Sequence, residues 1–515
     1  MIQKRECCEM QLKQALYICA CIFILMYDVL QPLLPWKISS ELATLEKIIC
    51  FSCLGLIIAS IPNASRKKSL FCLALFWVWM IVIRLAIQHL TEAMTIEIVR
   101  VGLICTVFYL TSALDANGKR HLVDAFCALF FPILTVWAIM GLLVYTNVIP
   151  EVQIGEKRIY AVLEINRKLA YIMRYLVFFE LNKNVSATWF MTALWLSIGH
   201  FFRTRRKWVR VLLVLFGGLM YVTLSLQRCR FVNVACSVGA GMLAILLIKD
   251  HMKNPKTAIR RMAAVLAALV VAVGCYKGFG LCSGVAGKFA ALKASVADQP
   301  VERPALQPEE NEPSKLDAAP EAEIVSELKA EPVTEPETEP VTEPETEPKP
   351  ISESWTGDSR SFFKQLANMS DRTDIWASCL RVVFRRKKFM LLGQPVEEIP
   401  MNMVYYGDAD SAMGHAHNMF IQVLAQTGII GFGLMVAFTY MQVRAAIRLF
   451  FSREQPLSRK IYGILLTCLL LEGVGESLLL LQFAPLALMF TAGMLADQEE
   501  PTDFRKIFRF RRKKA

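Results

Sequence analysis

The sequence predicts an all-α integral membrane protein with about twelve transmembrane helices. Of the 515 residues, 55% are hydrophobic, and the mean hydropathy of +0.41 is too high for a soluble globular protein. Apolar runs of about 20 residues recur along the chain, and a helix of this length crosses the hydrocarbon core of a bilayer. We expect spans at about 15–35, 42–61, 69–88, 94–114, 122–145, 186–202, 209–226, 231–248, 262–281, 417–441, 461–480 and 483–496. The last two are alternatively a hairpin that does not fully cross.

Basic residues in the loops predict how the helices are oriented. Successive loops lie on opposite sides of the membrane, and the basic residues occur in every second loop, so they all lie on one side. The positive-inside rule places that side in the cytoplasm. Both termini are then cytoplasmic in a multi-pass protein of the cell membrane. These charges flank apolar spans, so they do not indicate a nucleic-acid-binding surface. The basic segments are 66–68, 119–120, 203–207, 249–261, 444–460 and the tail, and the outer segments are 36–41, 89–93, 146–185, 227–230 and 282–416.

One large extracytoplasmic segment, 282–416, separates helices 9 and 10. Its part 298–353 has 17 acidic against 4 basic residues, and proline recurs at every fourth position in EPVTEPETEPVTEPETEP. Proline blocks helices and sheets and like charges repel, so we expect a disordered spacer that carries no chemistry. Residues 354–416 should be ordered and helical. The predicted order is thus helices 1–9 in 1–281, this segment, helices 10–12 in 417–497 and a basic cytoplasmic tail in 498–515.

A short amphipathic helix is predicted from about residue 370. Ser370 or Asp371 is a suitable N-cap for it. The basic run 385–388 follows on the outer side, against the general charge trend, and a helix lying on anionic lipid headgroups would explain this. The residues that recur at helical spacing on one face are Ile375, Trp376, Cys379, Leu380 and Val383.

An arginine on this helix and a histidine before the tenth span form the first candidate site. Arg372 supplies a fixed cation, and His417 supplies a titratable base at the same membrane face. This pair suits chemistry on a lipid-linked phosphate, because arginine binds the phosphate and histidine moves a proton. Alternatively, His417 is an interfacial histidine without a role, or a metal ion is held by Asp408, Asp410, His415 and His417.

Two further arginines, Arg228 and Arg230, lie in the short turn SLQRCRF between spans seven and eight. Charges so close to the hydrocarbon core are costly and commonly functional, with contact to lipid headgroups as the alternative. Cys282 and Cys379 both fall in the outer segment, where a disulfide between them is one alternative.

Several other classes of membrane protein lack their sequence signals here. A phosphate-loop motif and a G-x-S-x-G elbow are absent, which argues against a nucleotide-driven pump and a serine hydrolase. A proton-coupled carrier needs a dense ionisable relay in mid-membrane. The spans contain few ionisable residues beyond Asp28, Arg84, Glu472 and Glu476.

Four short motifs, in this order and topology, resemble the O-antigen ligase and O-antigen polymerase superfamily of bacterial membrane glycosyltransferases. DRTDIW resembles the family's Arg-x-x-x-Trp helix and maps its arginine to Arg372. HNMFIQVLAQTGIIG resembles its His-Asn followed by a Gly-x-x-Gly span and maps its histidine to His417. LQRCRFVNVA resembles its Ser-Arg turn through Arg230, with Cys229 in place of serine. FFELNKNVSA resembles its Asn-Pro-Asn segment before the sixth span through Asn184, with lysine in place of proline.

The resemblance implies inverting transfer of a glycan from undecaprenyl diphosphate, on the outer face, without a cofactor, metal or nucleotide sugar. It implies His417, Arg372 and Arg230 as catalytic residues. Asn418, His415 and Asn184 are expected at the substrate, with Arg228 as the alternative arginine of the turn. His417 would take the acceptor's proton or orient the diphosphate. The partners would be the lipid-linked oligosaccharide, a glycan or glycolipid acceptor, the bilayer and other polysaccharide-assembly proteins.

Two questions stay open at the level of the sequence. The acceptor is a glycolipid core, the next lipid-linked repeat or a protein hydroxyl, and these correspond to a ligase, a polymerase and a protein-glycosylating enzyme. The rival function is a lipid-linked saccharide transporter or flippase. A flippase should carry its cations along a central cavity, whereas the arginines here cluster at one face, which favours a transferase.

Overall fold

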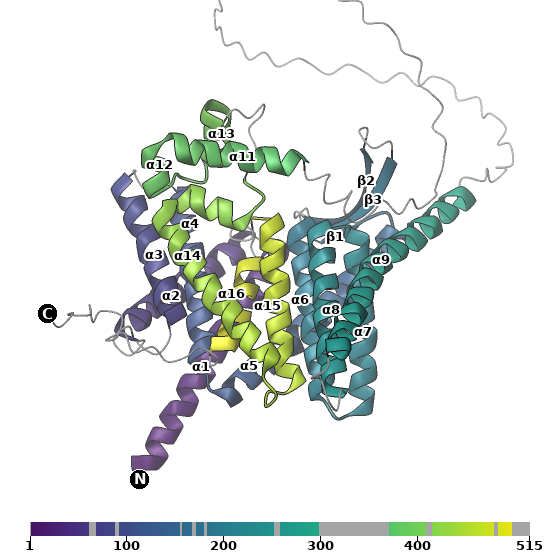
Figure 1. Ribbon diagram of the computed structural model, residues 1–515, viewed down its shortest axis with the longest axis horizontal. Helices are drawn as coiled ribbons and strands as arrows, with labels where there is room; N and C mark the ends of the chain where they lie inside the picture. The colour runs from purple at the N-terminus through teal and green to yellow at the C-terminus, as the bar shows by residue number, and fades with distance from the viewer. Residues whose placement is uncertain are drawn as a thin grey trace, which may run out of the picture.

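A computed structural model of the chain describes residues 2–34, 36–60, 68–87, 92–154, 157–166, 171–179, 183–251, 258–297, 370–407, 415–477 and 483–496 (Figure 1). These residues are mostly helical. The elements are α1 (Ile2–Leu30), η1 (Gln31–Leu33), α2 (Trp36–Ser60), α3 (Lys68–Ile87), α4 (Glu92–Ala113), α5 (Ala116–Tyr145), β1 (Val152–Ile154), β2 (Lys157–Asn166), β3 (Tyr171–Phe178), α6 (Lys183–Arg203), α7 (Lys207–Gln227), α8 (Arg230–His251), α9 (Ala258–Ala297), α11 (Ser370–Arg385), α12 (Lys387–Leu392), α13 (Ile399–Gly407), α14 (Met419–Phe451), α15 (Leu457–Gly475) and α16 (Phe483–Leu495).

Nine of the helices in the described part of the chain are long and apolar enough to cross a membrane, namely α1, α3–α9 and α14. This confirms a membrane-embedded, predominantly helical protein. The other three predicted spans also coincide with helices, α2, α15 and α16, and α16 is the shortest of these three at 13 residues. Two helices extend well past their predicted ends, because α9 continues to Ala297 and α14 continues to Phe451.

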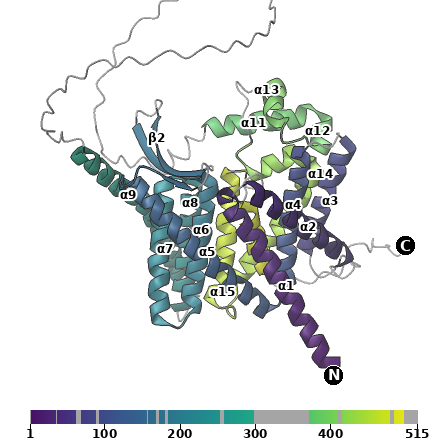
Figure 2. The same cartoon turned by 180° about the vertical axis from the view of Figure 1, so that it is seen from behind.

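The helices form a bundle in which α15 and α16 are largely buried, whereas α14 leaves one apolar face exposed, with Tyr440 and Ile447 on it (Figure 1). α15 packs on α6 and α8, α14 packs on α3 and α15, and α16 packs on α4. By contrast, α7 and α9 leave apolar residues such as Val211, Leu215 and Leu266 exposed. Exposed apolar stripes on outer helices are stable when lipid, and not water, surrounds them. Figure 2 shows α1 along the other side, with its first turns extending beyond the bundle.

A three-stranded antiparallel sheet lies at one end of the bundle, in the segment 146–185 that joins α5 to α6 (Figure 1). β1 pairs with β2, and β2 pairs with β3 from Ile159 opposite Phe178 to Asn166 opposite Tyr171. The sequence patterns did not predict this sheet. Its strands are rich in Ile, Val and Tyr, which favour strands, but a connecting segment between spans gave no reason to expect a sheet.

The short helices α11, α12 and α13 cover the same end of the bundle as the sheet (Figures 1 and 2). The predicted helix from residue 370 is confirmed as α11. Its expected apolar face packs into a small core of its own with α13 and α14, in which Ile375, Cys379 and Val383 are buried. Cys282 and Cys379 are both free thiols, so the alternative of a disulfide between them is not realised.

The helix α14 is interrupted at Gly428, where φ is 64° and ψ is −172°. Such an interruption leaves backbone carbonyls without helical partners. Neighbouring groups bond them instead. Gln394 N donates to Ala425 O at 2.9 Å, Trp79 Nε1 donates to Thr427 O at 2.9 Å, and Arg84 Nη2 donates to Gln426 O at 3.2 Å.

The Arg84–Glu97 ion pair stabilises this interruption, because both side chains form hydrogen bonds to Gln426. The two side chains are 2% and 9% exposed, with 2.9 Å between Arg84 Nη2 and Glu97 Oε2. Glu97 Oε1 accepts from Val396 N at 3.2 Å and from Gln426 Nε2 at 3.3 Å. A buried pair is tolerable only with such additional hydrogen bonds. Through them α3 and α4 hold both α14 and the segment between α12 and α13 in place.

Candidate functional site

Arg372, His417 and Glu476 meet at the end of the bundle that α11, α12 and α13 cover (Figure 1). Arg372 lies in the first turn of α11, and His417 lies in the short segment that leads into α14. Glu476 directly follows Gly475, the last residue of α15. The structure therefore brings together the two residues that the sequence singled out first, and a third residue joins them.

The Glu476 carboxylate contacts both basic side chains. Oε1 accepts a hydrogen bond from Arg372 Nη2 at 2.8 Å, and Oε2 lies 3.2 Å from His417 Nδ1. The Glu476 side chain is 1% exposed, whereas those of Arg372 and His417 are 28% and 29% exposed. A buried carboxylate thus holds two side chains that remain accessible to a ligand.

The contact with Glu476 determines which nitrogen of His417 carries the proton. An ionised carboxylate can only accept a hydrogen bond, so Nδ1 must donate and Nε2 keeps its lone pair. A histidine oriented in this way can act as a general base, and the carboxylate stabilises the imidazolium that forms. His417 is therefore equipped to accept a proton at Nε2.

Two further contacts hold Arg372. Its Nη1 donates to Gly475 O, and its guanidinium carbon lies 4.7 Å from the centre of the Phe231 ring. Phe231 belongs to the first turn of α8, so α8, α11 and α15 meet at this point. The two hydrogen bonds use two of the five guanidinium N–H donors, which is compatible with an anionic ligand at the others.

Asn418 ties the start of α14 to the end of α15. Its Oδ1 caps α14 by accepting from the backbone N of Phe420 and Ile421 at 2.9 and 3.1 Å. Its Nδ2 donates to Val474 O at 2.9 Å. This double attachment keeps the neighbouring His417 beside Glu476.

His415 lies directly against His417. The ring centres are 4.0 Å apart, and His415 Nδ1 accepts from the His417 backbone N at 3.2 Å. Burial, together with the neighbouring His417, lowers the pKa of His415 to about 4. His415 is consequently neutral near pH 7 and supports His417 as a hydrogen-bond acceptor.

The turn between α7 and α8 contacts the start of α6. Cys229 Sγ donates to Asn184 Oδ1 at 2.7 Å, and Gln227 Nε2 donates to Ser186 Oγ at 2.8 Å. Cys229 and Asn184 come from two of the four motifs on which the family resemblance was based. The structure therefore places these two motifs in direct contact, although 45 positions separate the two residues.

The two arginines of this turn lie in different surroundings. Arg228 is half-buried and interacts with the Tyr145 hydroxyl, and its Nε is buried without a hydrogen-bond partner in the described structure. Arg230 is exposed at the start of α8, close to Tyr276 of α9, and precedes Phe231, whose ring lies under Arg372. Arg228 therefore has an unsatisfied N–H, while Arg230 adjoins the Arg372 site in sequence.

Backbone strain marks two of the predicted site residues. His417 and Arg228 have φ values of 48° and 52°, a region that non-glycine residues rarely adopt. Within the described ranges, Asn147 and Phe179 are the other non-glycine residues with positive φ. Such conformations cost of order 1–3 kcal/mol each and concentrate at functional sites. The fold thus holds His417 and Arg228 in place at an energetic cost.

Glu476 was not predicted as part of the site. It was noted only as an ionisable residue within a predicted span. With Glu472, it is one of two carboxyl groups in the otherwise uncharged string LLLEGVGES, and this was a usable signal because buried charges in membrane proteins need partners. Asp408 and Asp410, proposed as alternative metal ligands, lie outside the described residues.

No protein-family model matches the chain, and no curated protein matches its sequence. The arrangement of residues is therefore the basis for assigning a function.

Proposed function

We propose that the protein is a membrane glycosyltransferase of the O-antigen ligase or polymerase type. It would transfer or polymerise an undecaprenyl-diphosphate-linked glycan during assembly of a cell-surface polysaccharide. The observation that carries this proposal is the convergence of Arg372 and His417 on Glu476. Glycosyl transfer from a lipid diphosphate needs a base for the acceptor proton and a cation for the leaving diphosphate. A histidine oriented by a carboxylate and a neighbouring arginine can supply these two groups.

In the proposed reaction, an acceptor hydroxyl attacks the anomeric carbon of the lipid-linked glycan and inverts its configuration. His417 Nε2 takes the hydroxyl proton as the new glycosidic bond forms. The bond between the anomeric carbon and the diphosphate breaks, and its electron pair stays on the phosphate oxygen. Glu476 stabilises the protonated His417, and Arg372 donates to the departing diphosphate.

Further positive charge is needed in this mechanism, because Glu476 already neutralises Arg372. The arginines of the α7–α8 turn would supply it. Arg228 offers a buried N–H without a partner in the described structure, and Arg230 lies one residue from the ring under Arg372. Both remain candidates for the arginine that the resemblance assigns to this turn.

The proposed topology has twelve spans, both termini in the cytoplasm and the site on the outer face of the cell membrane. The described basic segments fit it, because they gather at the opposite end of the bundle from α11–α13. Lys249 at the end of α8 donates to Phe451 O at the end of α14, for example, and Lys119 at the start of α5 donates to Met494 O of α16. The acceptor class, and hence ligase, polymerase or protein glycosylation, stays open.

A lipid-linked saccharide transporter is the alternative function, and one genetic experiment separates the two. The gene is deleted, and the surface polysaccharide and the lipid-linked repeats are analysed by size and by leaflet. For the transferase, the polysaccharide size ladder is lost and repeats accumulate on the outer face, where a membrane-impermeant lectin or periodate reaches them. Repeats trapped on the inner face would instead support the transporter.

A further inference from the structure

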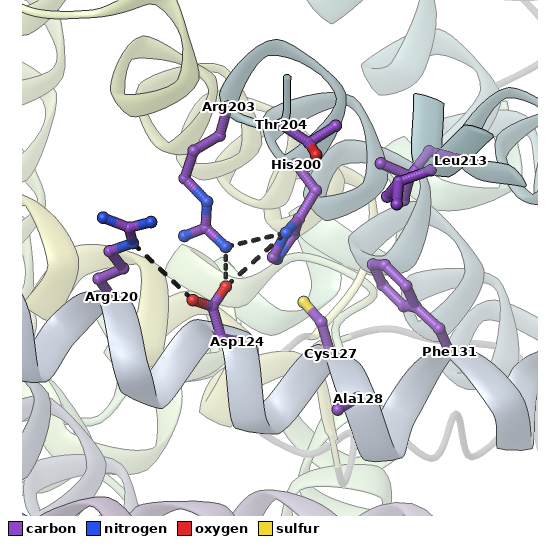
Figure 3. Close-up of a pocket in the computed structure, with 10 residues that line it drawn as sticks. Arg120, Asp124, Cys127, Ala128, Phe131, His200, Arg203, Thr204 and Leu213 are labelled. Carbon is purple, nitrogen blue, oxygen red and sulfur yellow. Dashed lines mark hydrogen bonds and ion pairs between the residues drawn. The ribbon is translucent and has the colours of Figure 1, made fainter. Parts of the chain in front are cut away.

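A second polar cluster lies at the other end of the bundle, where α5 begins, α6 ends and α7 begins. Here the structure has a cavity of about 350 Å³. One side is lined by Arg120, Asp124, His200 and Arg203, and another by apolar residues that include Phe131 and Leu213 (Figure 3). A volume of this size is in the range of small-molecule sites and far exceeds that of a single phosphate group.

The polar side of this cavity carries a net positive charge. Arg203 pairs with Asp124, and Arg120 Nε lies 3.9 Å from the same carboxylate (Figure 3). Two guanidinium groups thus face one carboxylate. Exposure of 65% for the Arg120 side chain and 26% for that of Arg203 leaves both accessible to an anion.

His200 adds a donor that lacks an acceptor. Arg203 Nη2 donates to His200 Nδ1 at 2.9 Å, which places the proton of the neutral ring on Nε2. Nε2 is buried and has no hydrogen-bond partner in the described part of the chain. A buried N–H without an acceptor is costly, and an oxygen-rich ligand in the cavity would satisfy it.

The apolar side continues onto the outer surface of the bundle. Phe131 of α5 stacks on Phe216 of α7 at 4.4 Å between ring centres and meets the His200 ring edge to face. Beyond them, Leu212 and Leu215 of α7 are exposed. The cavity therefore joins a cationic head to an apolar surface of the kind that lipid tails cover.

We propose that this cavity binds the phosphate of an anionic membrane lipid, with Arg120, Arg203 and His200 at the phosphate and with an acyl chain along Phe131 and Leu213. Arg205 and Arg206 are exposed on the adjoining turn and do not line the cavity. The apolar side of the cavity favours a lipid, because a free phosphate would leave the apolar residues uncovered. The leaflet is the cytoplasmic one in the proposed topology, and the site is independent of the proposed transferase activity.

Binding is tested with the purified full-length protein in detergent, by native mass spectrometry and by thermal stabilisation on titration with phosphatidylglycerol. Phosphatidylcholine and glycerol phosphate serve as the other two ligands. The test variant is Arg120→Gln with Arg203→Gln. The matched control is Arg205→Gln with Arg206→Gln, which removes the same charge from exposed positions that lie outside the cavity. Arg120→Gln alone serves if the double variant does not fold.

The wild-type protein and the control variant should bind phosphatidylglycerol at least about tenfold more tightly than the test variant, because charge-assisted hydrogen bonds are lost there. Leu213→Gln should weaken the lipid and leave glycerol phosphate unchanged. Equal binding of phosphatidylglycerol by wild-type protein and test variant would overturn the site. Glycerol phosphate binding as tightly as the lipid would overturn its assignment to a lipid.

Discussion

At the scale of single residues, the site depends on one buried carboxylate. Glu476 is 1% exposed and holds Arg372 and His417 through its two oxygens. Because a carboxylate in this position both orients the histidine and balances the charge, it cannot be replaced by a neutral group of the same shape. The amide of glutamine accepts at one atom only, and it carries no charge.

Replacing Glu476 by glutamine should lower glycosyl transfer by at least about 100-fold while the protein still inserts into the membrane. The physical reason is that the His417 imidazolium and Arg372 lose their counter-charge. The measurement is the initial rate of transfer with the purified variant. Glu454→Gln, at an exposed position at the other end of the bundle, is the control and should retain the wild-type rate. A wild-type rate in Glu476→Gln would remove this residue from the mechanism.

His415 should make stability depend on pH. Burial lowers the pKa of His415 from the ordinary value of 6.5 to about 4. The unfolded chain therefore binds a proton that the folded chain does not bind between these two values. The stability that this group contributes is fully present above about pH 6.5 and is lost as the pH falls towards 4.

The check compares thermal unfolding of the wild-type protein and of His415→Gln between pH 7 and pH 4.5. The charged groups that face His415 are His417, Glu476 and Arg372, and both proteins contain them. The difference between the two curves therefore isolates the titration of His415. The midpoint should fall less on acidification in the variant. Parallel curves for the two proteins would contradict the burial of a neutral imidazole.

At the scale of elements, the short helices α11–α13 are joined to the long helices at the interruption of α14. Gly428 and Gly393 both have positive φ, and each lies against the backbone of the other's segment. A Cβ at Gly428 would overlap the Leu391 backbone, and one at Gly393 would overlap that of Gln426. The close approach of α12 to α14 therefore requires glycine at both positions.

Gly428→Ala should destabilise the protein by about 1–3 kcal/mol through backbone conformation alone, with a further loss from the displaced α12. Gly433→Ala is the matched control on the same helix, because a Cβ there meets nothing within 4 Å and alanine favours a helix. Thermal unfolding in one detergent measures both. Equal unfolding temperatures for the two variants would contradict a requirement for glycine at the interruption.

Breaking the buried Arg84–Glu97 pair should lower the free energy of unfolding more than breaking an exposed ion pair. Glu97→Ala leaves the Arg84 charge buried and removes the acceptor of Val396 N and Gln426 Nε2, so we expect a loss of about 3–5 kcal/mol. The reference is Glu151→Ala, which breaks an exposed pair with Arg158 and should cost under about 1 kcal/mol. Equal destabilisation in the two variants would argue against this anchoring role.

At the scale of the whole molecule, the helices were largely predictable and their junctions were not. Long apolar runs predict helices because a bilayer leaves the backbone no other way to satisfy its hydrogen bonds. Each predicted span coincides with a helix, although nine meet the length and composition expected for crossing. The sheet β1–β3 and the interruption at Gly428 depend on contacts between distant segments, and local patterns do not encode such contacts.

The candidate site was predicted in the same uneven way. Arg372 and His417 stood out as a fixed cation and a titratable base predicted at one membrane face, and the structure places them around one carboxylate. Glu476 could not be assigned to them from the sequence, because nothing local indicates that the end of α15 meets the start of α11. Arg228 and Arg230 illustrate a further limit, since two arginines two positions apart differ in burial and neighbours.

The central claim is that Arg372 and His417 catalyse glycosyl transfer from a lipid diphosphate. The most direct measurement is the transfer rate of the purified protein with an undecaprenyl-diphosphate-linked glycan, for Arg372→Ala and His417→Ala. Each should be about 30- to 1,000-fold slower than wild type, the equivalent of roughly 2–4 kcal/mol of barrier, and chelator should leave the wild-type rate unchanged. Arg381→Ala on the same helix and His121→Ala, both at exposed positions, should stay near the wild-type rate. Full activity in His417→Ala, or loss of wild-type activity in chelator that added metal restores, would contradict this mechanism.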